Sequence, residues 1–141
     1  MRKSLSSTRC CENWSTWQDF PRRREICSRS SGPYRDRSSI YISCDPKKNA
    51  LIFPHLAWAE YLKMWPGPEE GERPAAYIVI LRDTLVSAAS GCDHGIAAQS
   101  ILLGAVERGL GGCIIGSISK TKLREALAIA ARYEILLVLA L

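Results

Sequence analysis

The strongest constraint on the fold of this chain lies in residues 93–117, DHGIAAQSILLGAVERGLGGCIIGS. In its first part, apolar residues recur near one face at steps of three to five, which predicts an amphipathic helix. Asp93 is the expected N-cap of this helix and Gly109 its expected stop. A Gly-Leu-Gly-Gly break and a short apolar strand ending at Gly116 follow. The apolar face of the helix consists of Ile96, Ile101, Leu102, Ala105 and Val106.

Two continuous apolar runs predict the central strands of a sheet. Residues 75–81 and 134–141 are apolar without alternation, which is typical of strands covered on both faces. A second helix is predicted over residues 123–131, between the short strand and the last one. Helices and strands that alternate around one sheet indicate an α+β or α/β domain, with a central sheet flanked by helices.

A further helical stretch is predicted over residues 47–63. Asp45 and Pro46 form its opening signal, and Pro54 is expected to break or kink it. Prolines, glycines and acidic residues then gather in residues 66–74, which indicates a polar loop before the first central strand.

Over residues 44–141 the order of these elements resembles the nitroreductase family. There too, a buried strand, a helix with a Gly-rich turn, a short strand, a helix and a second buried strand follow one another. The resemblance implies an incomplete nitroreductase-type α+β fold and an FMN-dependent oxidoreductase. Such an enzyme passes electrons from NAD(P)H through the flavin to a nitroaromatic, quinone or similar small molecule. Because the flavin performs the hydride transfer, we expect no catalytic side chain.

The same resemblance implies the cofactor-binding residues. One segment of nitroreductases passes against the isoalloxazine ring, and its chemistry needs a backbone N–H directed at the flavin N5 edge with little side-chain bulk. Gly116 meets the second requirement. The matching residues of this chain are Cys113, Ile114, Ile115 and Gly116.

Several small residues lie on the helix predicted at the start of residues 93–117, so another helix or a sheet can approach its backbone closely. These small residues are Ala97, Ala98, Gly104 and Ala105. On these residues alone, an ordinary core helix is as good an interpretation as an interface helix. The matching helix of nitroreductases lies in the core of a dimer, so the resemblance implies a homodimer that forms through this face.

The net charge of the chain lies entirely in its first third. Residues 1–43 carry a net charge of +5 and residues 44–141 a net charge of zero. An arginine- and serine-rich segment of this kind has three interpretations: a nucleic-acid-binding arm, a transit peptide, or a segment translated out of frame. Four acidic residues argue against a transit peptide, and tryptophans and cysteines without helical or strand period are unusual in a disordered tail. We therefore treat residues 1–43 as an anomalous segment, separate from a partial domain at residues 44–141.

The codon table favours the out-of-frame interpretation. When residues 9–31 are read one nucleotide earlier, with free third bases, RCCENWSTWQDFPRRREICSRSS becomes PLLRKLVDLARFSPSAGNLQPLK. The first half of the new string is an amphipathic helix, and SPSAGNLQP resembles the nitroreductase loop that lies over the flavin. We hypothesise that residues 9–39 are out of frame and that the family frame resumes near Tyr41.

The cysteines and histidines do not predict a metal or nucleophile site. Outside the anomalous segment three cysteines remain, widely spaced and odd in number, which favours a reduced cytoplasmic protein. Cys92, Asp93 and His94 are adjacent, but no second Cys/His pair completes a site. His55 lies among Phe53, Leu56 and Trp58 and is expected to be packed.

The chain departs from the family in its phosphate contacts. Nitroreductases usually begin with an arginine-containing segment that grips the FMN phosphate and end with a tail that adds another basic contact. Lys120 and Lys122 are the nearby cations, without an assigned position. Two other hypotheses therefore stay open: a non-catalytic remnant that keeps the dimerisation core, and a basic arm that binds nucleic acid. The zero charge of residues 44–141 argues against nucleic acid, and no apolar run is long enough for a membrane span.

Overall fold

One antiparallel sheet with the strand order β1-β2-β4-β3 forms the centre of the protein. Its strands are β1 (Ser38–Ser43), β2 (Tyr77–Asp83), β3 (Cys113–Ile115) and β4 (Tyr133–Ala140). The computed structural model describes residues 38–58, 65–86, 88–89 and 91–141. The expectations for residues 1–37 and for residues 59–63 of the helical stretch lie outside the described residues. The sheet begins with β1 at Ser38, which precedes the expected start of the domain at residue 44.

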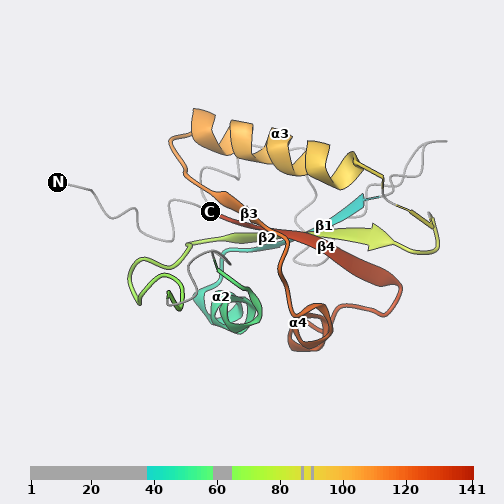
Figure 1. The fold of residues 1–141 in the computed structure, drawn as a ribbon, viewed down its shortest axis with the longest axis horizontal. Coiled ribbons are helices and arrows are strands. Elements are labelled where there is room, and N and C mark those ends of the chain that lie inside the picture. The colour runs from blue at the N-terminus through green and yellow to red at the C-terminus, as the bar shows by residue number, and fades with distance from the viewer. Residues whose placement is uncertain (1–37, 59–64, 87, 90) are drawn as a thin grey trace.

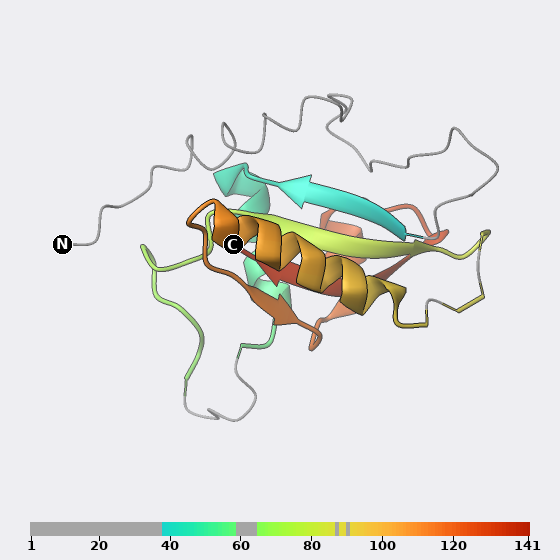
Figure 2. The ribbon, with the colours of Figure 1, turned by 90° about the horizontal axis from the view of Figure 1, so that it is seen from above.

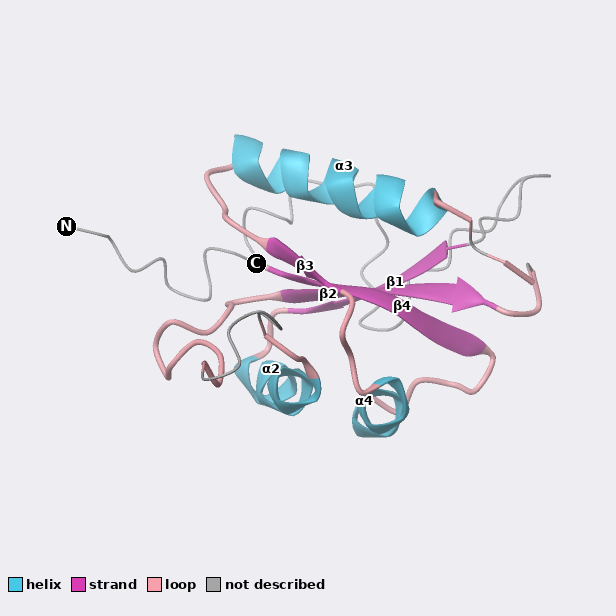
Figure 3. Cartoon of the chain, viewed as in Figure 1, coloured by secondary structure: helices cyan, strands magenta, loops and turns pink. Residues whose placement is uncertain are grey.

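Helices cover both faces of this sheet. Helix α3 (Asp93–Glu107) lies along one face, and α2 (Pro46–Ile52) and α4 (Lys120–Ala126) lie on the other (Figure 1). The view from above shows α3 running along the strands, and the colouring by secondary structure shows three layers (Figures 2 and 3). This arrangement confirms the predicted α+β fold with helices around a central sheet.

The two predicted central strands are the centre of the sheet. β2 pairs with β1 on one side and with β4 on the other, and β4 also pairs with β3. Side chains of β2 alternate between two hydrophobic clusters. Tyr77, Val79 and Leu81 join the cluster that faces α2 and α4, whereas Ile78 and Ile80 join the one under α3. The absence of hydrophobic alternation in the sequence follows from this double coverage.

The limits of α3 are confirmed at one end and corrected at the other. Gly109 has φ +73° and donates to the Val106 carbonyl at 2.9 Å, and Leu110 donates to the Ala105 carbonyl at 3.0 Å. These two bonds form a Schellman motif, which needs the left-handed backbone that glycine adopts without strain. The expected Asp93 cap is wrong: Cys92 occupies the N-cap position without a side-chain cap bond, and Asp93 is the first helical residue.

The predicted apolar face of α3 also needs correction. Ala98 and Ala105 are fully buried against the sheet, and Ile101 packs beside them. Ile96 and Val106, by contrast, are 65% and 64% exposed. The helix is apolar on more than one side, so the hydrophobic period could not identify the side that the sheet covers.

The helices on the opposite face are shorter than expected, and α4 also begins three residues before its predicted start at residue 123. Asp45 caps α2 by accepting from the Lys47 amide at 3.0 Å, and Pro54 ends the stretch in a short 3₁₀ helix, η1 (Phe53–His55). Helix α4 begins at Lys120 and ends at Ala126, before the predicted end at residue 131. Ala128 has φ 51°, and this turn lets Ile129 enter the hydrophobic core.

Candidate functional site

The expected cofactor-binding segment lies at an edge of the sheet. β3 pairs with β4 from Cys113 to Ile115, opposite Ala140 to Val138, and the ladder between these two described strands goes no further. The chain then leaves β4 and turns towards η1. Ser119 donates to the His55 carbonyl at 2.9 Å, and the Ala57 amide donates to the Ser117 carbonyl at 3.0 Å.

Gly116 is the residue at which the two strands separate. A Cβ built on Gly116 would meet only the Leu137 side chain, at 3.7 Å, which is ordinary contact. Gly116 itself is exposed, and Ile114 is 43% exposed, whereas Ile115 is buried in the core. This edge therefore offers exposed backbone and one exposed apolar side chain to a ligand, and Ile115 holds it to the sheet.

Gly112 explains how the turn before β3 comes close to the rest of the domain. A Cβ there would lie 2.5 Å from Leu141 Cδ2 and 2.9 Å from both the Ala140 carbonyl oxygen and Leu102 Cδ2. Real Cβ atoms do not approach other atoms this closely, so the turn needs glycine at this position. The Gly-rich break thus fixes where the segment of residues 113–116 begins.

Cys113 does not have the character of a nucleophile. Although Cys113 is exposed at the edge of the sheet, partial burial of its thiol raises the pKa, and a thiol with a raised pKa is protonated at neutral pH. The sheet register places Tyr77, Ala140 and Cys113 in one row across three strands. Burial raises the pKa of Tyr77 to about 12, with smaller effects from Arg73, which lowers it, and Cys113, which raises it. Both groups are therefore neutral at physiological pH.

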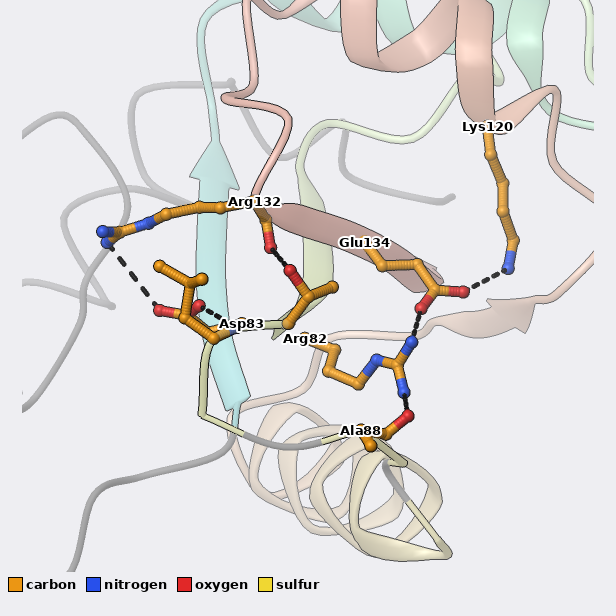
Figure 4. A network of polar contacts seen from close by, with 8 residues as sticks. Arg82, Asp83, Ala88, Lys120, Arg132 and Glu134 are labelled. Carbon is orange, nitrogen blue, oxygen red and sulfur yellow. Dashed lines mark hydrogen bonds and ion pairs between the residues drawn. The ribbon is translucent and has the colours of Figure 1, made fainter.

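A network of charged residues lies where β2 and β4 meet the loops at one end of the sheet. Arg82 binds Glu134 Oε2 through Nη2 and the Ala88 carbonyl through Nη1. Lys120 Nζ lies 3.8 Å from Glu134 Oε1, so each carboxylate oxygen of Glu134 faces one cation (Figure 4). Nearby, Arg132 Nη2 lies 3.8 Å from Asp83 Oδ2.

Sequence reasoning missed this network. Its members come from three separate elements, so no spacing in the sequence indicates that they meet. The available signal was the placement of charged residues at the ends of apolar strands, as in Arg82 and Asp83 after the apolar run of β2. Lys120, which we considered for the phosphate, forms an ion pair with Glu134.

The remaining candidates for chemistry stay apart in the described part of the chain. No group of three or more His, Cys, Asp or Glu residues there is placed to hold a metal ion. His55 is half-buried at the end of η1, and His94 is half-buried at the start of α3 with a buried Nδ1 that has no partner. Among the described helices, none combines the length and the apolar character that a membrane span requires.

Comparison with known proteins agrees with the fold. The sequence profile of the nitroreductase family matches residues 63–141. A search of curated proteins finds no match.

Three similar solved structures come from different bacteria. An FMN-dependent nitroreductase from Clostridium difficile R20291 is 22% identical and has a TM-score of 0.56, with 80% of this chain and 66% of that chain covered. A nitroreductase family protein from Clostridium novyi NT is 18% identical, with a TM-score of 0.57 and the same coverage. Nitroreductase A from Vibrio parahaemolyticus RIMD 2210633 is 19% identical, with a TM-score of 0.56 over 96% of this chain and 67% of that one. This chain thus spans slightly less than two thirds of the two clostridial proteins.

Proposed function

The chain belongs to the nitroreductase family, and on this basis we propose that it is an FMN-dependent oxidoreductase. NAD(P)H would be the reductant, and a nitroaromatic, quinone or similar small molecule would be the electron acceptor. The observation that best supports this proposal is the separation of β3 from β4 at Gly116, in the segment that resembles the flavin-contacting part of the family.

The edge at Gly116 fits a flat aromatic ring. The space beside Gly116 is bounded on one side by Leu137, and Ile114 is an exposed apolar neighbour that can pack against a ring. Exposed backbone at Gly116 and Ser117 can bond to the polar edge of the ring without a side chain in the way. Bound FMN would supply the hydride-transfer chemistry, while these residues would position the ring and exclude water from it. No described side chain needs to act as an acid or base.

A homodimer is the second part of the proposal. Ile96, Leu103 and Val106 are spaced seven and three residues apart, so they form one stripe along α3, and all three are more than half exposed. Ala97 and Gly104 follow Ile96 and Leu103 directly and flank this stripe, which allows another surface to approach closely. Ala98 and Ala105, expected on the same face, are buried against the sheet and take no part in it.

The test is flavin binding by the purified chain, with its absorbance spectrum and its mass under native conditions. We expect Gly116→Val to lower flavin occupancy, because a branched side chain would fill the space that the ring needs. The matched control is Gly111→Val, since a Cβ at Gly111 has no atom within 4 Å. Unchanged occupancy in Gly116→Val would remove this glycine from the proposed site, and equal losses in both variants would indicate an effect on the turn.

A non-catalytic remnant that keeps the dimerisation core is the alternative. The comparison is flavin titration of this chain beside a version with residues 9–39 in the neighbouring frame and with a basic C-terminal tail. Two phosphate-directed charged hydrogen bonds, each worth roughly 1.5–3 kcal/mol, correspond to about two to four powers of ten in affinity. Equal affinities and equal NAD(P)H-dependent nitroreductase rates would show that the described residues suffice.

A further inference from the structure

We infer that Glu134 is a positioning residue that couples the loop before α3 to the chain that follows Gly116. Its two carboxylate oxygens hold two cations from different elements, Arg82 of β2 and Lys120 of α4 (Figure 4). Arg82 in turn binds the Ala88 carbonyl, which lies between β2 and α3. One carboxylate thus connects both helical layers through the sheet. As a statement about the flavin site, the inference rests on the proposed function.

The first half of this link holds the chain after Gly116. Residues 116–119 lie outside the β3–β4 ladder, and backbone bonds to His55 and Ala57 hold them from the side of η1. Lys120 follows directly, and its ion pair with Glu134 adds a link to β4 beside the packing of Ile118 against the core. Leu137, which belongs to β4 like Glu134, lies next to Gly116. β4 therefore lies close to this segment at Gly116 and again at Lys120.

The second half holds the entry into α3. The Ala88 carbonyl accepts from Arg82, and the helix begins a few residues later at Asp93. Without Glu134, the Arg82 guanidinium would lose the partner that fixes its direction. Glu134 is two-thirds buried and Arg82 more so, with side-chain exposures of 33% and 18%. Solvent therefore screens this contact less than it would screen a pair on an open surface.

Substitutions of Glu134, Lys120 and Arg82 can test the two halves of the link separately. Glu134→Gln keeps the shape and removes the charge that both cations face. Lys120→Met removes only the contact between Glu134 and α4, whereas Arg82→Met removes both the contact with Glu134 and the contact with the loop before α3. Asp83→Asn is the matched control, because it changes the same kind of charge in the neighbouring pair with Arg132 and keeps the oxygen that accepts from the Leu85 amide.

Hydrogen exchange of the full chain tests the coupling without a ligand. The reporters are the Ser119 and Ala57 amides on one side and the Gly95 and Ile96 amides at the start of α3 on the other. Glu134→Gln should speed exchange in both sets, Lys120→Met only in the first and Arg82→Met only in the second. Loss of a partly exposed ion pair should raise the exchange rate of each affected set of amides by about 1.4- to 5-fold. Asp83→Asn should leave both sets unchanged.

Flavin titration then tests the role in the site. If Lys120 acts through Glu134, then Lys120→Met and Glu134→Gln each weaken flavin binding, and the double variant is no weaker than Glu134→Gln alone. Additive losses of flavin affinity in the double variant would overturn this role. The coupling would also be overturned if Glu134→Gln changed the exchange of only one of the two sets of amides. If the unmodified chain binds no flavin, the proposed function fails, while the exchange pattern still decides whether Glu134 couples the two segments.

Discussion

At Gly112 the surrounding atoms leave no room for a methyl group. In Gly112→Ala the new Cβ would lie 2.5 Å from Leu141 Cδ2 and 2.9 Å from Leu102 Cδ2 and the Ala140 carbonyl oxygen. A leucine side chain can move by changing rotamer, but the carbonyl belongs to a strand that pairs on both sides. The turn must therefore move away from β4, and β3 must move with it.

The magnitude follows from a comparison with the preceding residue. Overpacking of this kind costs about 1–3 kcal/mol. Replacement of glycine by alanine also restricts the unfolded chain and stabilises the protein by about 0.4–1 kcal/mol. Gly111→Ala has the second effect without the first, because a Cβ at Gly111 has no atom within 4 Å and its φ is not in the left-handed region. The difference between the two variants isolates the overpacking.

Urea unfolding followed by circular dichroism measures this difference. We expect Gly112→Ala to be less stable than Gly111→Ala by about 1–3 kcal/mol, with the same dependence of the free energy on urea concentration. Equal stabilities would refute the reasoning, because they would show that the turn tolerates a side chain against the Ala140 carbonyl. A loss of the same size in both variants would place the cause in the backbone of the turn and not in the contact with β4.

Three further changes test other parts of the structure. Tyr77→Phe removes a buried hydroxyl without a partner and should leave stability at pH 7 unchanged or raise it by up to about 1 kcal/mol. Because burial raises the folded-state pKa of Tyr77 to about 12, the folded protein keeps the phenolic proton that the unfolded chain loses above pH 10. The free energy of unfolding of the wild type should therefore fall by about 2–3 kcal/mol more than that of the variant between pH 10 and 12. Gly104→Leu should weaken dimerisation in sedimentation without unfolding the monomer, since the nearest atom to a Cβ there is Arg108 Nη1 at 3.9 Å; a folded monomer for the unmodified chain would contradict the dimer. Alkylation of Cys113 should keep accelerating above the pH at which an ordinary thiol levels off, because partial burial raises the pKa of this thiol. A rate that levels off at the usual pH would contradict the raised pKa.

The elements that the sequence predicts well are those with a local physical cause. Asp45 and Pro46 start α2 because a carboxylate cap and a proline without an N–H both suit the first helical turn. Gly109 ends α3 because the Schellman turn needs positive φ. The apolar runs of β2 and β4 predict burial on both faces directly, whereas the charged network around Glu134 depends on tertiary contacts between residues 82, 120 and 134, which no local pattern reveals.

The two faces of α3 show why its small residues do not mark a single exposed face. The sheet covers the face with Ala98 and Ala105, where small side chains let the helix approach, and the larger Ile96, Leu103 and Val106 stay exposed. Complete burial of such a side chain contributes roughly 1.5–3 kcal/mol, so two stripes that are about two-thirds exposed could contribute on the order of 6–12 kcal/mol to a symmetric dimer. Association itself costs about 4–15 kcal/mol, which is the same size. The stripe on α3 is therefore only marginally sufficient, and a stable dimer must bury apolar surface beyond this helix.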